Sequence, residues 1–395
     1  MNDLRSFQAA LSPRKRLLLL VLVAVVVLGV LAATVFRDQT VSVFRRLTVS
    51  QADDFSHNAQ SNSLFLGMED DLLVCTQSQI QLFSPTGAVR FKETVSLKSP
   101  ALSVAGRHAV VYDVGGQELR RISGQKLVDK LSLPAESSFL CANVNDKGWL
   151  AVTTREGGYK GVVTIYDADF QPVLSIRLSS RYISDAVVTP DCHGVYLVSP
   201  GQSGGIFENT LLYYTFSSKD APAREVALGS NVVLSVYSGG GKCWILGDKD
   251  LFILDSSGVV TASYDYQGEY LRMGSLQGDG FATLLLARSA SGSVATLVTV
   301  GSDGKEIGSL PIEGQTMALA AQGSHVGVLT TSSILTAGRK LDHYYVQPNQ
   351  RGIRNLALYQ DGGVALIGSA TVGLTYCNSG ERTAPPAPEE EATVS

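Results

Sequence analysis

Five histidines and five cysteines are the side chains of this 395-residue sequence best suited to metal binding or nucleophilic catalysis. Metal sites are typically indicated by such residues at short, recurring spacings. Here the histidines are scattered one to a region and the cysteines show no CxxC spacing. We therefore expect no catalytic residue, no metal site and no cofactor, and cysteines that act as small buried apolar side chains. The residues are His57, His108, His193, His325 and His343, and Cys75, Cys141, Cys192, Cys243 and Cys377.

The glycine-rich and aspartate-rich stretches also lack the context that phosphate or calcium binding requires. Gly157-Gly158, Gly204-Gly205 and Gly239–Gly241 do not stand between a strand and a helix, as a phosphate-binding loop would. They are typical of hairpin turns. Paired aspartates such as Asp248 and Asp250 lack the spacing of a calcium-binding loop. A quinone-dependent dehydrogenase is not indicated either, because the sequence has no adjacent cysteine pair.

Charge is unevenly distributed along the sequence. Residues 1–37 hold five Lys or Arg and one Asp, so the rest of a chain with net charge −4 carries −8. That acidic remainder has no dense Lys/Arg stripe of the kind that binds a phosphate backbone. The sequence therefore predicts no nucleic-acid partner.

A long uncharged stretch follows the basic residues near the start of the chain. Residues 17–36 read LLLLVLVAVVVLGVLAATVF and come directly after Arg14, Lys15 and Arg16. A helix needs about 20 apolar residues to cross about 30 Å of hydrocarbon, whereas the apolar region of a cleaved signal is ~7–15 residues long. We predict a transmembrane anchor, with cleavage near Ala32-Ala33 as the alternative. Because basic flanks stay in the cytoplasm, residues 1–16 are expected there and the rest of the chain outside.

After residue 40, short β-branched and aromatic runs recur between turn residues, and helix-period patterns are nearly absent. Eight times, an apolar run is followed by a turn or short loop and a second run, at intervals of 37–49 residues. The second runs are centred on Leu82, Arg121, Ile165, Tyr214, Ile253, Val298, Leu335 and Leu374. A period near 40 residues with four short strands per unit is typical of a β-propeller blade. We predict an all-β propeller of about eight four-stranded blades, with seven as the alternative.

The end of the repeat suggests how the ring closes. The last unit, Gly352–Cys377, has room for only three strands. We expect Val41–Val49, soon after the anchor, to supply the fourth strand and remove an exposed sheet edge. The propeller is thus predicted to span residues 37–378, with Cys75 and Cys377 in neighbouring blades and their pairing left open. The Pro-rich, acidic tail 379–395 is predicted to be disordered.

The segment Ile80–Gly87 reads I-x-L-F-x-x-x-G. Together with the anchor and the blade spacing, this pattern resembles a family of bacterial single-pass membrane proteins with a propeller-like outer domain, catalogued as a domain of unknown function. The resemblance covers roughly residues 14–377, and WD40-like and quinoprotein-like propellers share its cues. It implies a membrane-anchored propeller and carries no catalytic residues over to this sequence.

Loop lengths distinguish the two faces of the predicted propeller. Connections between the first and second strands and between the third and fourth are mostly short turns. Longer connections, including Ser199–Asn209, lie on the other face, which gathers side chains of the types that anchor interfaces. The candidate partner-binding residues are Tyr159, Arg181, Tyr182, Phe207, Tyr264, Tyr266 and Tyr270. We expect this face to point away from the membrane.

These observations predict a non-enzymatic, extracytoplasmic scaffold or sensor, held in the cell membrane by one N-terminal helix, that binds a protein or cell-envelope partner. A module that recognises glycans or small ligands is one alternative. A hydrolase or lyase with its site in the central channel is another. That enzyme would need titratable groups in the channel, whereas the expected inner strands, such as Ala186–Val188 and Leu319–Ala321, are small and apolar.

Overall fold

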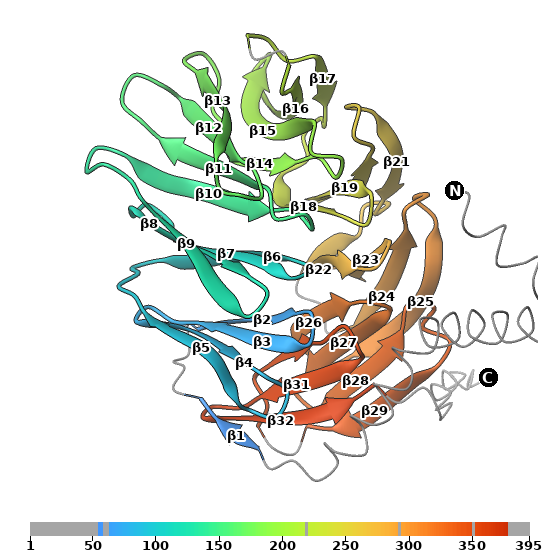
Figure 1. Ribbon diagram of the computed structural model, residues 1–395. Coiled ribbons are helices and arrows are strands. Elements are labelled where there is room, and N and C mark those ends of the chain that lie inside the picture. The colour runs from blue at the N-terminus through green and yellow to red at the C-terminus, as the bar shows by residue number, and fades with distance from the viewer. Residues whose placement is uncertain (1–53, 58–62, 218–219, 291–293, 350–351, 378–395) are drawn as a thin grey trace, which may run out of the picture. The chain divides into compact units, whose positions relative to one another are not determined.

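The computed structural model describes residues 54–57, 63–217, 220–290, 294–349 and 352–377 (Figure 1). The chain divides into two compact units, Met1–Ala52 and Asp53–Ser395, and the described residues all belong to the second. In those residues no helix is long and apolar enough to cross a membrane. The predicted anchor at 17–36, the predicted strand Val41–Val49 and the predicted tail 379–395 lie outside the described residues.

The described residues form eight four-stranded antiparallel sheets, which confirms the eight-bladed all-β propeller. The first four blades are β2 (Leu64–Met68), β3 (Asp71–Cys75), β4 (Gln79–Phe83) and β5 (Val89–Thr94); β6 (Pro100–Ala105), β7 (His108–Asp113), β8 (Glu118–Ser123) and β9 (Lys126–Ser132); β10 (Ser138–Val144), β11 (Leu150–Arg155), β12 (Gly161–Tyr166) and β13 (Pro172–Leu178); and β14 (Asp185–Val188), β15 (Gly194–Ser203), β16 (Ile206–Thr215) and β17 (Arg224–Ala227). The other four are β18 (Val233–Gly239), β19 (Lys242–Gly247), β20 (Asp250–Leu254) and β21 (Val260–Asp265); β22 (Tyr270–Gly278), β23 (Phe281–Ala287), β24 (Val294–Gly301) and β25 (Glu306–Glu313); β26 (Thr316–Gln322), β27 (His325–Thr330), β28 (Ser333–Gly338) and β29 (Tyr344–Pro348); and β30 (Asn355–Leu358), β31 (Gly363–Ile367) and β32 (Thr371–Tyr376) with β1 (Phe55–Ser56).

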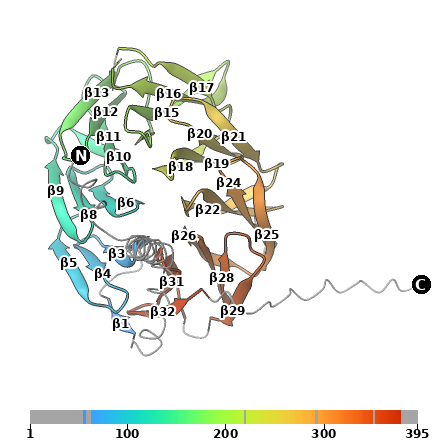
Figure 2. The same cartoon turned by 45° about the vertical axis from the view of Figure 1, so that its right-hand side comes forward.

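The blades stand side by side in a ring, as Figure 2 shows. The first strands, among them β6, β18, β22 and β26, lie around the centre, and fourth strands such as β9 and β25 lie on the outside. All eight predicted second runs fall in the third strand of a blade. The middle strands are the most deeply buried: β3 is buried throughout, whereas the outer strand β5 alternates between exposed and half-buried residues.

Burial occurs between blades. The described apolar side chains form eight core clusters, and each cluster combines residues of two adjacent blades. In one of them, Val163 and Leu174 of the third blade pack with Val195 and Leu197 of the fourth. A sheet can bury both faces only when it has a neighbour on each side, so the ring must be complete.

Closure occurs through a strand from near the N-terminus, but not through the predicted segment. The fourth strand of the last blade is β1, in which Phe55 pairs with Val372 and Ser56 with Thr371. The Phe55 ring lies 5.3 Å from the Phe83 ring of the first blade, measured between centroids. This two-residue strand therefore joins the last blade to the first, the role that we had assigned to Val41–Val49.

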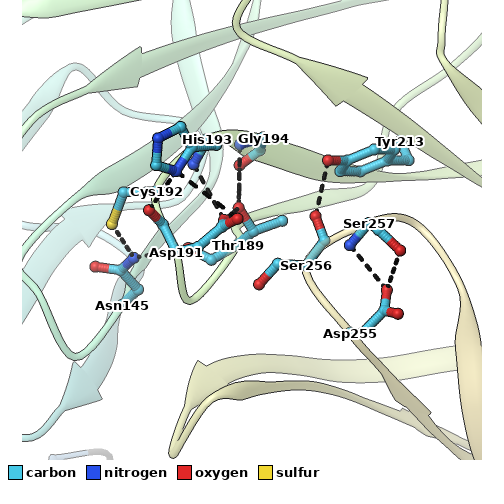
Figure 3. A network of polar contacts seen from close by, with 10 residues as sticks. All are labelled: Asn145, Thr189, Asp191, Cys192, His193, Gly194, Tyr213, Asp255, Ser256 and Ser257. Atoms are coloured by element: carbon cyan, nitrogen blue, oxygen red, sulfur yellow. Dashed lines mark hydrogen bonds and ion pairs between the residues drawn. The ribbon is translucent and has the colours of Figure 1, made fainter.

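Several hairpin turns share one stabilising device, in which the first side chain of the turn accepts backbone hydrogen bonds. Asp255 Oδ1 accepts the N–H groups of Ser257 (2.8 Å; Figure 3) and Val259 (3.1 Å). Asn145 Oδ1 accepts those of Lys147 and Trp149 in the same way. Such Asx turns satisfy backbone donors that the sheet leaves unpaired.

None of the five cysteines, all of which lie in the described residues, forms a disulfide. Cys75 packs in the cluster between the first and second blades, and Cys377 packs in the cluster between the seventh and eighth. The two residues therefore occupy neighbouring blades, as expected, but different cores. Burial raises the pKa of Cys75 to about 12, which keeps this thiol protonated and inert.

We expect Gly87→Ala to destabilise the propeller more than Gly115→Ala. Both glycines have positive φ, 82° and 76°, so each substitution costs about 1 kcal/mol of backbone strain. A Cβ at 87 would also lie 2.4 Å from Phe55 Cβ, whereas nothing lies within 4 Å of one at 115. In urea unfolding, the Gly87 variant should be less stable than the Gly115 variant by at least about 1 kcal/mol. Equal losses would mean that β1 does not pack tightly on this turn.

Candidate functional site

Six of the seven predicted binding residues reach the surface on one face of the propeller. We call it the connection face, because it carries the segments between the second and third strands of each blade and between successive blades. The opposite face, with the other two sets of turns, is the hairpin face. Tyr182 is 59% exposed and Tyr270 is 52% exposed. The six residues are Tyr159, Arg181, Tyr182, Phe207, Tyr264 and Tyr270.

Tyr266 does not belong to this surface. Its side chain is 2% exposed and packs in the core between the fifth and sixth blades. The hydroxyl donates to the carbonyl of Gly247 (3.1 Å). A tight turn produces this burial, because Glu269 N–H donates back to the Tyr266 carbonyl and Gln267 adopts φ +53°. Tyr266 thus positions the neighbouring loop and offers nothing to a partner.

The segment Ser199–Asn209, expected as a loop, is a two-stranded arm. Strands β15 and β16 remain paired up to Ser203 and Ile206, but β14 pairs only with 195–198 and β17 only with 210–213. Residues 200–208 therefore extend beyond the sheet as a two-stranded ribbon from β15 and β16, which lie at the top of Figure 1. Ile206, at the tip, is 68% exposed, and Phe207 beside it is also exposed.

A hollow of about 360 Å³ separates this arm from the connection between β13 and β14. It brings together Arg181 and Tyr182 from that connection with Gln202 and Glu208 from the arm, and with Lys160. Arg181 Nη1 lies 3.0 Å from Glu225 Oε2, and Lys160 Nζ lies 5.1 Å from the centre of the Tyr182 ring. These contacts hold the exposed side chains in place before any partner binds.

Two further exposed apolar residues escaped the sequence analysis. The register shifts by one residue near the start of β18 and β26, and the extra residues are Leu234 and Met317. Such bulges turn a side chain away from the alternating pattern. Leu234 is 56% exposed, and Met317 is exposed as well. Both lie near the connection-face ends of inner strands, like Tyr270 at the start of β22.

Asp191, Cys192 and His193 on the hairpin face have the residue types of a thiol hydrolase, but not its geometry (Figure 3). The His193 ring contacts the carbonyl of Asp191 at 2.7 Å, and among the described residues no hydrogen bond joins it to the thiol. Cys192 Sγ instead accepts from Asn145 Nδ2 at 3.3 Å. Burial raises the pKa of Cys192. Without a base to activate the thiol, this trio is a turn and not a nucleophile.

A second polar cluster lies on the inner strands. Asp185 Oδ1 accepts from Cys141 Sγ (2.9 Å), from Asn143 Nδ2 (2.5 Å) and from the N–H of Ala186 (2.8 Å). Burial raises the pKa of Asp185 to about 6, and burial followed by the nearby Asp185 carboxylate raises the pKa of Cys141 well above its usual range. Cys141 is therefore a hydrogen-bond donor that supports a carboxyl group titrating near neutrality.

The sequence predicts few titratable groups on the inner strands, and this cluster places two, Cys141 and Asp185, on β10 and β14. Asp185 directly precedes the apolar run Ala186–Val188, so a polar residue at the start of an inner strand was the available signal. In the described part of the chain, no group of three or more His, Cys, Asp or Glu side chains is placed to hold a metal ion.

Comparisons with known proteins are consistent with this fold. A model described as a family of unknown function (DUF5711) matches residues 40–340. The chain is similar to the C-terminal WD40 domain of Sif2, with 13% identity and a TM-score of 0.56, over 82% of this chain and 97% of that one. It is also similar to a structure described as the eukaryotic initiation factor, with 10% identity and a TM-score of 0.51, over 80% of this chain and 85% of that one. A search of the curated proteins finds no match. At these identities the structural likeness shows a WD40-like β-propeller fold alone.

We expect Asp185→Asn to remove one component of the pH dependence of stability. Because the folded state raises this pKa from 3.8 to about 6, it binds the proton more tightly than the unfolded chain does. The free energy of unfolding should therefore fall by up to about 3 kcal/mol as the pH rises through this window. Asn keeps the accepting oxygen but does not ionise, so the variant should match the wild type near pH 4 and exceed its stability above pH 7.

Urea unfolding between pH 4 and pH 8 measures this difference. The exposed Asp169→Asn serves as the control and should leave the profile unchanged. Parallel profiles for the wild type and Asp185→Asn would contradict the assignment.

Proposed function

The chain belongs to DUF5711, a family of unknown function, and we propose that it is a non-enzymatic binding module that engages a protein or cell-envelope partner through its connection face. The observation that carries this proposal is the two-stranded arm with an apolar tip. A two-stranded ribbon is marginally stable in water by itself. Here it extends beyond the sheet and leaves Ile206 and Phe207 exposed. A partner that covers the tip would bury the apolar area that the propeller leaves in water.

The surroundings of the arm are those of an interface. Tyr and Arg are enriched among the residues that dominate binding energy, because they combine large apolar contact area with a polar end. Tyr182 and Arg181 stand beside the arm at the hollow, held by Lys160 and Glu225. Side chains that are ordered in advance lose less conformational entropy when a partner binds.

The rest of the face extends this surface toward the centre of the ring. Leu234, Tyr270 and Met317 add exposed apolar side chains at the ends of three inner strands. A rigid ring supports them, so the face can dock without a large rearrangement.

The hollow itself favours a second function, the recognition of a sugar. Its volume of about 360 Å³ lies within the ~300–1,000 Å³ range of small-molecule sites. An exposed tyrosine ring beside Gln202, Glu208 and Thr210 offers an apolar surface and hydrogen-bonding groups together. This function would use the same residues with a smaller partner.

We expect a triple variant with Tyr182, Phe207 and Tyr270 changed to Ala to lose its partner. Crosslinking in cells that produce the full chain, followed by mass spectrometry, should show recovery of a specific protein reduced at least about tenfold, because such anchors dominate interface energy. The control changes Val128, Val173 and Val346, exposed on outer strands, to Ser. Equal capture by both variants would contradict the assigned face. Capture of nothing specific by the wild type, with glycan binding by the purified chain, would favour the sugar function.

The location is part of the proposal. With residues 17–36 as an anchor, the wild-type chain should remain in membranes after a high-salt wash, because burial of about 20 apolar residues is effectively irreversible. A chain that begins at residue 38 should be released. An epitope after Ser395 should be accessible on intact cells, whereas one before Met1 should not. The reverse pattern of accessibility would overturn the proposed orientation.

A further inference from the structure

The central channel contains two adjoining cavities of about 270 Å³ each. One runs along the inner strands β2, β26 and β30, and its lining is mainly apolar, including Phe65 and Leu319. The other opens at the hairpin face and is lined by polar side chains from several blades. Gln277 and Gln322 line both cavities, so the two spaces meet at these amides. Figure 2 shows the inner strands β6, β18, β22 and β26 around this region.

Cross-ring hydrogen bonds shape the polar cavity. Gln277 Nε2 donates to the carbonyl of Val104 (3.3 Å), which joins the sixth blade to the second, on the opposite side of the ring. Gly240 N–H donates to Asp146 Oδ2 (3.2 Å), which joins the fifth blade to the third. The cavity is therefore framed by fixed contacts between blades that are not neighbours.

Gln322 is a nearly buried side chain of this cavity for which the described residues supply no partner. It is 7% exposed, and its amide makes no hydrogen bond with any of the described residues although it lines the cavity. Asp146 lines the same cavity and accepts Gly240 N–H with one of its two carboxylate oxygens. A ligand that donates hydrogen bonds would satisfy the Gln322 carbonyl beside the Asp146 carboxylate.

The charge at this site selects the ligand. Asp146 and Asp279 line the cavity, and no Lys or Arg does. Two cations of adjacent turns are engaged elsewhere, since Lys242 donates to Thr261 and the Arg107 guanidinium lies beside Gly124. Burial, with both aspartates nearby, raises the pKa of Tyr237 to about 12, which keeps this lining residue neutral. Its ring contributes the kind of surface that attracts cations.

We propose that the hairpin-face end of the channel binds the ammonium group of an aliphatic amine, with Asp146, Asp279 and Gln322 as acceptors. The apolar cavity beyond the glutamines receives the hydrocarbon chain. An ammonium group supplies three donors and a positive charge, which matches two carboxylates and an unpaired amide carbonyl. This site is at the opposite end of the ring from the connection face and does not depend on the function proposed there.

The test is calorimetric titration of the purified full-length chain in mild detergent with pentylamine, with 1-pentanol as the neutral probe of matched shape. We expect saturable binding of pentylamine, weakened by salt, and no binding of the alcohol. Binding of both probes with equal affinity, or of neither, would overturn the proposal. A titration with acetyl-Gly-Lys-Gly amide distinguishes a lysine side chain from a free amine as the source of the ammonium group.

Three variants locate the binding. Asp146→Asn and Asp279→Asn keep the shape and remove a charge, and each should weaken pentylamine binding about tenfold. Gln322→Met keeps the length of the side chain and removes the amide, and it should weaken binding as well. The control is Asp303→Asn, at an exposed turn of the hairpin face. The Asp303 carboxylate accepts Lys305 N–H and forms an ion pair with the Lys305 side chain. This variant should bind like the wild type. Unchanged affinity in the first three variants would place any binding elsewhere and overturn the assignment.

Discussion

Burial between adjacent blades is the constraint on which the rest of this structure depends. A four-stranded sheet has two faces and each blade covers only one side of its neighbour, so the eight described core clusters are all shared between blades. None of these cores exists within a single sheet. The strand Phe55–Ser56 therefore has an importance beyond its length, because it completes the last blade and packs against the first through Phe83. The stability of every blade is linked to this closure, since an open ring would expose apolar faces at two blades.

A closed ring also determines where binding can occur. The inner and middle strands are committed to the cores, so surface chemistry is left to the connections, to the bulges and to the arm that extends from β15 and β16. The bulges at Leu234 and Met317 expose apolar side chains near the ends of inner strands without disturbing the buried residues that follow them. The arm likewise exposes apolar side chains at the tip of a hairpin without disturbing the buried residues. Binding surfaces of this kind can change in sequence with little cost to the fold.

Burial and hydrogen bonding determine the behaviour of the polar groups inside the ring. Thiols such as Cys75 and Cys141 are buried and protonated, which makes them packing groups and hydrogen-bond donors. Carboxylates near the channel have hydrogen-bond donors: for Asp185 these are Asn143 of the preceding blade and the N–H of Ala186 in its own strand. Two polar groups near the channel have no hydrogen-bond donor among the described residues: the Gln322 amide and Oδ1 of Asp146. Polar groups that have hydrogen-bond partners stabilise the fold, whereas polar groups without partners indicate a site for a ligand.

The sequence by itself indicated most of the strands, their grouping into about eight units and the turns between them, and the structure decided between seven and eight. These features are local, because alternation of apolar residues and the turn chemistry of Gly, Asn and Asp act over a few residues. It also indicated the face on which Tyr182, Phe207 and Tyr270 lie, since antiparallel order assigns connections to faces. Only the tertiary structure decided that Phe55–Ser56 closes the ring, because a two-residue strand has no periodicity of its own. The burial of Tyr266, the bulges at Leu234 and Met317, and the meeting of Asp146, Asp279 and Gln322 were likewise decided by the ring. The meeting of Asp146, Asp279 and Gln322 depends on distances between blades that are far apart along the chain. The bulges and the turn at Tyr266 depend on how a strand pair or a turn packs against its neighbours. The alternation of apolar residues encodes neither.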